Sequence, residues 1–231
     1  MAFSDIGNRL TRIRARMADA AMRAGRNPAG VRLVAVSKTF PIDAVRAAYA
    51  AGQRDFGENR VQEGLQKIAQ STEMNIRWHL IGHLQSNKAK KAAESFWAVH
   101  SIDGIDLLER VDRAAEAAGR TPELLVQVDL ALEATKHGAP VDSLPGIFAA
   151  AAECKAARVT GLMLLPPLVE NAEDARPWFR RLSDLRMQLA DRGVSADLVR
   201  ELSMGMSHDF EVAIEEGATM VRIGTAIFGT R

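Results

Sequence analysis

Residues 32–38 read Arg-Leu-Val-Ala-Val-Ser-Lys, an apolar run that turns polar at its end. A short run of this kind, rich in valine and leucine, is typical of a strand buried on both faces, as in parallel sheets. Similar runs recur along the chain, and each is followed by a stretch with a different pattern. The candidate strands are Arg32–Ser37, Arg54–Gly57, Arg77–Ile81, Phe96–Ile102, Leu124–Leu130, Val159–Leu165, Val199–Ser203 and Thr219–Gly224.

Helical spacing of apolar residues fills the stretches between these strands. The patterns lie near residues 41–51, 59–70, 87–94, 104–118, 142–157, 171–191 and 207–216. Strands that alternate with helices favour a parallel sheet, and eight such units favour closure into an α/β barrel of the (β/α)8, TIM type. The alternative is an open doubly wound sheet. A Gly-x-Gly-x-x-Gly turn after an early strand would support that sheet, and the sequence has none.

An extra helix precedes the first strand. Its apolar positions recur at helical spacing, with Ser4 as a candidate cap and Gly25 as a candidate end. These positions are Ile6, Leu10, Ile13, Met17 and Ala20 or Ala21. We expect this helix to cover the gap beside the last strand, where an eighth outer helix would lie.

Composition limits the function classes. The chain has 231 residues, a normal length for a single barrel, so we expect one domain over residues 1–231. The net charge is +1 with both signs scattered, which argues against nucleic-acid binding. No apolar run approaches a membrane span, and the N-terminus lacks a signal-peptide core, so we expect a cytoplasmic protein without membrane contact.

Lys38 is the first candidate for chemistry. It is the only one of the seven lysines that ends an apolar strand. Active sites of barrels lie at the C-terminal ends of the strands, and a partly desolvated lysine there can form a Schiff base. An ordinary strand-end lysine that reaches into solvent explains the same position equally well.

Two turns near the C-terminus favour phosphate binding. The seventh strand runs into Ser-Met-Gly-Met-Ser-His-Asp at residues 203–209, and the eighth into Arg222-Ile223-Gly224-Thr225. Barrels often bind phosphate with the loops after these two strands. Ser207 is also a good N-cap for the next helix, and plain strand-to-helix turns use the same residue types.

Three further residues have both a binding and a structural interpretation. Asn59 could donate to a ligand or cap a helix, Met163 could face a flat ring or fill the core, and His79 could contact a ring or be a core histidine. His79 and His83 share strand parity, but no acid or cysteine lies at ligand spacing, so we predict no metal site.

Several motifs together resemble one known family. They are residues 36–39 (Val-Ser-Lys-Thr), 56–63 (Phe-Gly-Glu-Asn-Arg-Val-Gln-Glu), 78–88 (Trp-His-Leu-Ile-Gly-His-Leu-Gln-Ser-Asn-Lys), 100–103 (His-Ser-Ile-Asp), 161–163 (Gly-Leu-Met), 202–207 (Leu-Ser-Met-Gly-Met-Ser) and 222–229 (Arg-Ile-Gly-Thr-Ala-Ile-Phe-Gly). In order and over nearly the whole chain, they resemble the pyridoxal phosphate homeostasis protein family, also called the YggS/PROSC family. That family is a single barrel similar to the N-terminal domain of alanine racemase.

The resemblance implies a cofactor and its contacts. Pyridoxal 5′-phosphate is expected as a Schiff base on Lys38, with the phosphate against Ser203, Gly224 and Thr225 and with Arg222 close to the cofactor. The family influences vitamin B6 balance without a well-established reaction. We therefore expect the cofactor, and transiently apo-enzymes that use it, as partners, and a monomer or weak dimer.

The activity itself is open to three hypotheses. A racemase needs a base on each face of its substrate, and the only tyrosine, Tyr49, falls in an expected outer helix. No arginine pair for a substrate carboxylate is evident. Holding and delivering the cofactor is therefore the preferred function, with no catalytic residue assigned. Weak racemase-like activity on amino acids is the alternative, and a barrel enzyme for a phosphorylated sugar that uses Lys38 without a cofactor is the third.

Overall fold

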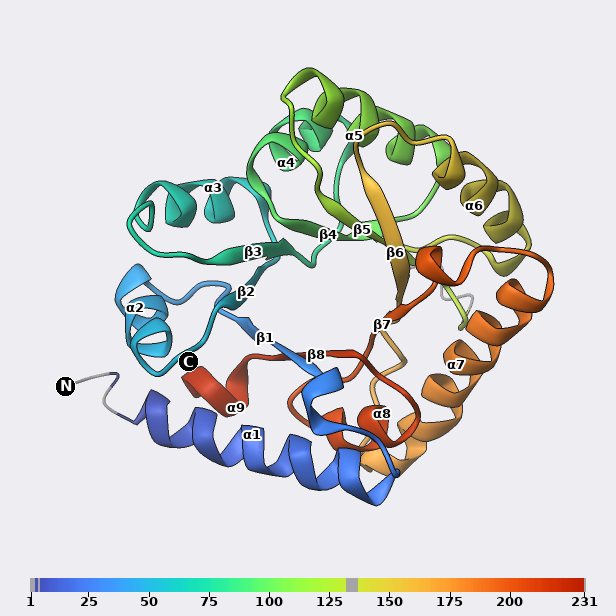
Figure 1. Ribbon diagram of the computed structural model, residues 1–231. Coiled ribbons are helices and arrows are strands. Elements are labelled where there is room, and N and C mark those ends of the chain that lie inside the picture. The colour runs from blue at the N-terminus through green and yellow to red at the C-terminus, as the bar shows by residue number, and fades with distance from the viewer. Residues whose placement is uncertain (1–2, 4, 132–136, 231) are drawn as a thin grey trace.

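Eight parallel strands form a closed barrel in which each strand pairs with its neighbours in sequence and the last pairs with the first (Figure 1). The computed structural model describes residues 3, 5–131 and 137–230, so the expected cap Ser4 lies outside the described residues. The strands are β1 (Arg32–Val36), β2 (Asp55–Glu58), β3 (Arg77–Leu80), β4 (Ala98–Ile102), β5 (Glu123–Gln127), β6 (Arg158–Met163), β7 (Glu201–Ser203) and β8 (Met220–Ile223). The predicted TIM-type barrel is confirmed, and the doubly wound alternative is wrong.

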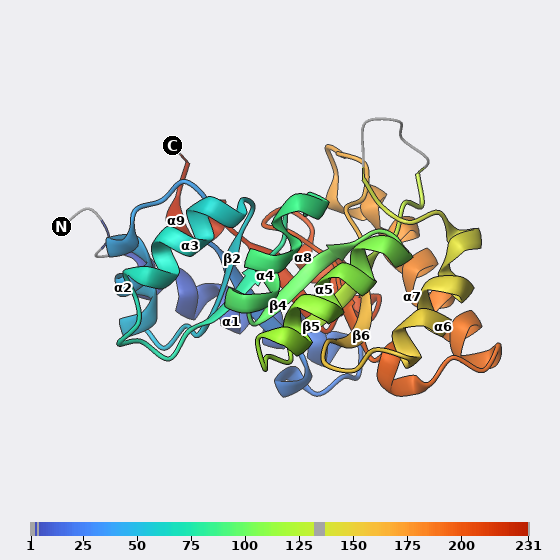
Figure 2. The same ribbon diagram turned by 90° about the horizontal axis from the view of Figure 1, so that it is seen from above.

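Helices surround the barrel, as Figures 1 and 2 show from two directions. They are α1 (Ile6–Arg23), α2 (Ile42–Ala50), α3 (Val61–Ala69), α4 (Ala89–Ser95), α5 (Ile105–Ala117), α6 (Leu144–Ala152), α7 (Arg176–Asp191), α8 (Phe210–Glu215) and α9 (Thr225–Phe228). Short 3₁₀ turns occupy Pro28–Gly30, Ser86–Lys88, Val141–Ser143, Ala172–Ala175 and Ala196–Leu198. None of the described helices is both long enough and apolar enough to cross a membrane.

Helix α1 lies along the outside of the barrel beside α2, α8 and α9 (Figure 1). Its apolar stripe, which includes Leu10 and Ile13, is buried against the rest of the protein. Gly25 ends the helix with φ +65°, and Arg26 N–H donates to the carbonyl of Ala21. The expected cover beside the last strand is therefore confirmed, and α9 adds one short turn to it.

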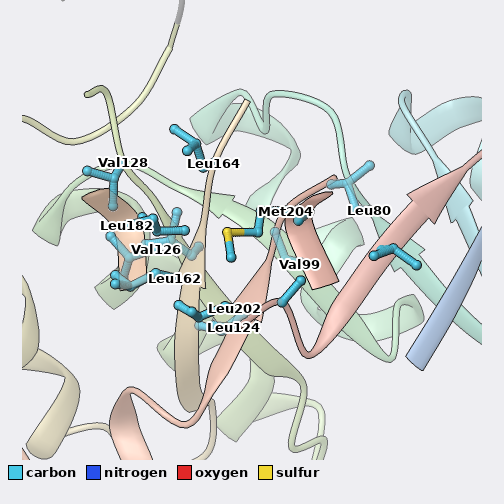
Figure 3. Packing of buried hydrophobic residues seen from close by; sticks show 14 of the residues in the cluster. Leu80, Val99, Leu124, Val126, Val128, Leu162, Leu164, Leu182, Leu202 and Met204 are labelled. Atoms are coloured by element: carbon cyan, nitrogen blue, oxygen red, sulfur yellow. The ribbon is translucent and has the colours of Figure 1, made fainter. Parts of the chain in front are cut away.

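The outward-facing residues of the strands pack against the helices. Figure 3 shows such a layer over β3 to β7, with Leu182 of α7 beside the strand residues. Its labelled members are Leu80, Val99, Leu124, Val126, Val128, Leu162, Leu164, Leu182, Leu202 and Met204. Alternate strand residues point to opposite faces, so the positions between these point into the barrel.

The barrel interior is apolar only in part. Leu125, Met163 and Met220 form a small cluster separate from the main core. Polar side chains share the interior with them, including the fully buried His79 and His100. Buried polar groups need hydrogen-bond partners, so the interior must contain a connected polar network.

Several predicted boundaries differ from the structure by a few residues, and two of them bear on the site. The strand expected to run to Leu130 ends at Gln127, because Val128 instead forms an isolated bridge with Ala139 in the following loop. The helix expected from residue 207 begins at Phe210 with Asp209 as its N-cap residue. The prediction that Ser207 caps this helix is therefore wrong, since its hydroxyl is bonded elsewhere.

Candidate functional site

A cavity of about 530 Å³ opens at the C-terminal ends of the strands. This size is typical of sites for small ligands. Its lining residues are Val36, Lys38, Asn59, Ile81, Gly82, His83, Gln127, His137, Leu165, Met206, Ser207, His208, Arg222, Gly224 and Thr225. They include the basic side chains of Lys38 and Arg222 and no carboxylate, so the described part of the cavity suits an anionic ligand.

The backbone on both sides of Lys38 is held by one buried cluster. The Lys67 ammonium donates to the Ser37 carbonyl at 2.7 Å and to Glu58 at 2.7 Å, and Ser37 Oγ donates to Glu58 at 2.6 Å. Lys67 also pairs with Glu63, whose carboxylate accepts from the Thr39 N–H. Burial raises the pKa of Glu58, against the opposing hydrogen bonds from Lys67 and Ser37. Lys38 thus extends from a strand end whose backbone is held on both sides.

Thr39 adopts a left-handed conformation immediately after Lys38, with φ +64°. This region is uncommon for a β-branched residue, and such outliers cluster at ligand sites. The turn directs the chain away from β1 while Lys38 stays on the cavity wall. Among the described residues, no hydrogen bond or ion pair occupies the Lys38 amine, so it is available to a ligand.

Ser207 and the β8 turn form the side of the cavity next to the end of β1. Ser207 Oγ accepts from the N–H groups of Gly224 and Ala226, at 3.2 and 3.4 Å. The oxygen thus accepts twice, and no described residue accepts its proton, so the hydroxyl can donate to a ligand. The Thr225 N–H and hydroxyl are also without a partner in the described part of the chain.

Gly205 fixes the path of the loop that carries Ser207. Its φ is +90°, and a Cβ there would lie 2.5 Å from the Cβ of Ala213. The Gly205 carbonyl accepts from the Arg222 N–H at 2.9 Å, which joins this loop to β8. A larger residue would displace the loop, so glycine is required for this side of the cavity.

Arg222 lies at the base of the cavity and is almost fully buried. It donates to Ser203 Oγ at 2.6 Å and to the Leu164 carbonyl at 2.9 Å. Burial lowers the pKa of Arg222 to about 10, so it is still protonated at neutral pH. Asp209 favours the Arg222 charge from beyond ion-pair distance, and no described carboxylate forms an ion pair with it, so a bound anion would be its direct partner.

A chain of hydrogen bonds crosses the barrel interior behind Arg222. Ser203 Oγ lies 2.9 Å from His100 Nδ1, and His100 Nε2 lies 2.9 Å from His79 Nδ1. His79 Nε2 in turn lies 3.0 Å from Asp55 Oδ1. We call Asp55, His79, His100, Ser203 and Arg222 the interior relay.

The two ends of the interior relay fix the direction of every bond in it. Burial opposes ionisation of Asp55, but hydrogen bonds from His79 and Arg77 outweigh it and lower its pKa, so Asp55 accepts from His79 Nε2–H. Burial also lowers the pKa of His79 and holds the pKa of His100 well below its usual value, so both are neutral. Each neutral ring accepts at Nδ1, and the Ser203 hydroxyl must therefore donate to His100.

This direction separates the two serines of the Ser-Met-Gly-Met-Ser segment. The single proton of Ser203 is committed to His100, and its oxygen accepts from Arg222. Ser203 is fully buried and is absent from the cavity lining, whereas Ser207 lines the cavity with a free proton. The family resemblance implied that the phosphate lies against Ser203. In the structure, Ser207 lies on the cavity wall and Ser203 lies beneath it.

The other predicted site residues fall into two groups. Lys38, Asn59, Arg222, Gly224 and Thr225 share the cavity wall. Asn59 does not cap α3, whose N-cap position is Arg60.

His79 and Met163 lie inside the barrel and not on the cavity wall. His79 belongs to the interior relay, and Met163 to the small apolar cluster. Sequence reasoning missed His83, Gln127, His137 and His208 as cavity residues. The available signal was that Gln127 ends β5 and that His83 and His208 follow β3 and β7 by a few residues, whereas His137 lies farther along the loop after β5 and had no such signal.

Comparison with known proteins agrees with the fold and the family resemblance. The family model "Alanine racemase, N-terminal domain" matches residues 9–231. Alanine racemase from Streptomyces coelicolor A3(2) superposes with a TM-score of 0.69 at 23% identity, over 96% of this chain and 59% of that chain. The protein therefore has the barrel of the alanine racemase N-terminal domain.

More similar relatives define the family within that class. The pyridoxal phosphate homeostasis protein of Aquifex aeolicus is 43% identical over 96% of this chain and 97% of its own, and that of Pseudomonas aeruginosa is 44% identical over 99% and 96%. PipY from Synechococcus elongatus, solved with PLP bound, superposes with a TM-score of 0.86 at 40% identity, covering 97% of this chain and 100% of that one. The chain belongs to the pyridoxal phosphate homeostasis protein family.

Proposed function

We propose that this chain binds pyridoxal 5′-phosphate on Lys38, limits the free cofactor and releases it to apo-enzymes. The family and the PLP-bound structure of PipY support the choice of ligand. In this proposal the protein acts in the cytoplasm, and residues 1–231 form one domain. The observation that carries it is the unpartnered Lys38 amine in a cavity with an unpaired Arg222 and no described carboxylate.

The donor set of the cavity fits the parts of this cofactor. When bound, the cofactor supplies an aldehyde that condenses reversibly with a primary amine and loses water. Lys38 is the amine on the cavity wall. Ser207 and Thr225 provide hydroxyl protons, and Thr225 a backbone N–H, for the phosphate, while Gly224 holds Ser207 in place through its own N–H. Arg222 and Asn59 are left to contact the polar edges of the ring.

The buried residues behind the cavity have supporting roles in this proposal. Ser203 and His79 act through Arg222, because the interior relay orients the guanidinium and leaves its charge directed at the ligand. Met163 fills the barrel interior beneath the cavity floor with Leu125 and Met220. The cluster around Lys67 keeps the strand end rigid, so that only the Lys38 side chain moves when the cofactor is exchanged.

Holding the cofactor is favoured over racemase chemistry by the position of Tyr49. It lies in the outer helix α2, where Arg54 stacks on its ring at 4.0 Å and its hydroxyl accepts from Asn75 N–H at 3.2 Å. Tyr49 is therefore occupied away from the cavity and does not serve as a base opposite Lys38.

Slow chemistry on amino acids is a second candidate function because three histidines, His83, His137 and His208, line the cavity. Exchange of an amino acid α-proton in deuterated water, measured on loaded wild-type protein and on Lys38→Ala, tests it. Exchange that depends on Lys38 would establish the second function. If exchange does not exceed the rate in buffer, only the binding function is supported.

The attachment residue is tested by chemical trapping. Protein loaded with pyridoxal 5′-phosphate is reduced with borohydride and digested, and the modified peptide is located by mass spectrometry. We expect the label on Lys38 and none in Lys38→Ala. Lys155→Ala, which removes a lysine outside the cavity lining, is the matched control and should label as wild type. A label on any other lysine in the wild-type protein would overturn the proposal.

A further inference from the structure

Three side chains with metal-binding chemistry meet at the rim of the cavity. His83 follows β3, Asp103 follows β4 and His137 lies in the loop after β5. These strands are neighbours in the barrel, so the loops at their C-terminal ends lie side by side. One ligand atom from each residue lies within 4.8 Å of the others, and His83 Nδ1 is 3.6 Å from Asp103 Oδ2.

The backbone at two of these positions is held by short bonds. Ser101 Oγ donates to the carbonyl of Gly82, the residue before His83, at 2.7 Å. The Gln127 side chain donates to the His137 carbonyl, and Ala139 N–H donates to the Gln127 carbonyl at 2.7 Å. The His83 and His137 rings are stacked, with centroids 3.6 Å apart and planes 10° from parallel. The cluster is therefore built on the strand ends and on the bonds between them.

The side chains suit a cation. Imidazole nitrogens and a carboxylate oxygen are ligand atoms that zinc takes in proteins. Among the described residues, His83 is the only basic side chain within ion-pair distance of Asp103. Asp103 is therefore not neutralised by a described lysine or arginine.

We propose that His83, Asp103 and His137 bind a divalent transition-metal ion such as Zn²⁺. Two imidazoles and a carboxylate are a common zinc ligand set, with the fourth position left to water or to a ligand. Bond lengths of 2.0–2.2 Å place tetrahedral ligand atoms about 3.3 Å apart, so side-chain rotations that draw the atoms in by up to about 1.5 Å complete the site. The sequence did not reveal this group of ligands because its three residues follow three different strands.

Bound metal would join the loops after β3 and β5 across the rim of the cavity that contains Lys38. The ion would thereby restrict the route by which a ligand enters and leaves. Metal binding itself requires only the three side chains and not the cofactor. The site can therefore be tested separately from the proposed function.

The test is a Zn²⁺ titration of tag-free, cofactor-free full-length protein by calorimetry, followed by the visible spectrum of the Co²⁺ form. We expect saturation at one ion per chain and tetrahedral Co²⁺ bands. His137→Asn and Asp103→Asn should each weaken Zn²⁺ binding at least about tenfold. His208→Asn, which removes a cavity histidine outside the cluster, is the matched control and should bind as wild type. Lys38→Ala should also bind as wild type.

Two results would overturn the site. One is the absence of saturable Zn²⁺ binding in folded wild-type protein. The other is stoichiometric binding that survives in both His83→Asn and His137→Asn, since the metal would then lie elsewhere. Circular dichroism of each variant verifies folding. Borohydride labelling of Lys38 in the same preparations reports separately on the proposed function.

Discussion

The two ends of the barrel contain charged residues in opposite situations. At the N-terminal end, the first residues of five strands form a network of ion pairs; they are Arg32, Asp55, Arg77, Glu123 and Glu201. Arg200 adds pairs to Glu123 and Glu201, and Trp97 lies against the guanidinium groups of Arg32 and Arg77. This end is closed by charges that neutralise one another.

At the C-terminal end, Lys67 is paired with Glu58 and Glu63, but the two basic residues on the cavity wall, Lys38 and Arg222, have no ion-pair partner among the described residues. We call this the unpaired end after these two cavity residues. An unpaired buried charge destabilises a fold, whereas a paired one is at least partly compensated. The comparison indicates that the paired end maintains the barrel and that the unpaired end is reserved for an anionic ligand. Substitutions at the two ends should therefore affect different measurements.

The largest expected effect is on stability, at the paired end. Asp55→Ala leaves the buried His79 Nε2–H and the Arg77 guanidinium without their acceptor, so we expect the free energy of unfolding to fall by about 3 kcal/mol. Urea denaturation measures it. The control is Asp43→Ala, which removes an exposed carboxylate paired with Arg46 and should cost less than about 0.5 kcal/mol. Equal losses in the two variants would refute the special role of the paired end.

The next largest effect is expected on cofactor affinity, from a substitution at the unpaired end. Arg222→Gln removes a charged donor from the cavity, and we expect the dissociation constant of pyridoxal 5′-phosphate to rise by about tenfold or more. The free energy of unfolding should change by less than about 1 kcal/mol, because relief of the unpaired charge offsets the lost hydrogen bonds. Equilibrium dialysis and urea denaturation measure the two quantities.

The matched control for Arg222 is Arg200→Gln at the opposite end. Arg200 belongs to the paired network and not to the cavity. Its replacement should leave cofactor affinity at the wild-type value. If Arg200→Gln weakened binding as much as Arg222→Gln, the division of roles between the two ends would be wrong.

A smaller effect distinguishes the two serines at the unpaired end. Ser207→Ala removes a free hydroxyl proton from the cavity, so cofactor affinity should fall about fivefold, the value of one hydrogen bond. Ser203→Ala should lower affinity by less than about half that factor, because its proton points to His100, while stability falls by about 1 kcal/mol. A larger affinity loss in Ser203→Ala than in Ser207→Ala would show that Ser203 contacts the phosphate directly.

The two serines, Ser203 and Ser207, illustrate how much of the site could be predicted from the sequence alone. The barrel was predictable because valine- and leucine-rich runs alternate with amphipathic stretches, and only the strand ends, as at residues 128–130, were misjudged. Lys38 and the turn at 222–225 were recognisable because each directly follows a strand. A strand end is visible in one sequence, and so these positions needed no tertiary information.

The remainder of the site depends on which strands are neighbours and which faces point inward. Ser203 and Ser207 are the same residue type in one short segment, and only the His100 and Gly224 contacts separate their roles. His100 and Asp55 come from different strands, and His83 and Asp103 come from the loops after two different strands. Such pairs are invisible until the barrel closes, because sequence spacing carries no information about contacts between strands.

The smallest expected effect is on the pH dependence of stability, and it concerns Asp55 at the paired end. Hydrogen bonds from His79 and Arg77 outweigh burial and lower the pKa of Asp55 below its ordinary value of 3.8. The unfolded chain then takes up this proton at higher pH than the folded one, so the contribution of Asp55 to stability is full above the ordinary pKa and is lost as pH falls through the folded value. The difference in unfolding free energy between wild type and Asp55→Asn should therefore be constant above the ordinary pKa of Asp55. It should shrink as the pH falls from there through the lower pKa of the folded protein.

Urea denaturation at a series of pH values on either side of the ordinary pKa measures this difference. Asp43→Asn, at an exposed carboxylate, is the matched control and should follow the wild-type curve in parallel. A difference for Asp55→Asn that stays constant through acid pH would mean that Asp55 is not the ionised acceptor of His79. The direction of the interior relay would then be reversed, and Ser203 would regain a proton for the cavity.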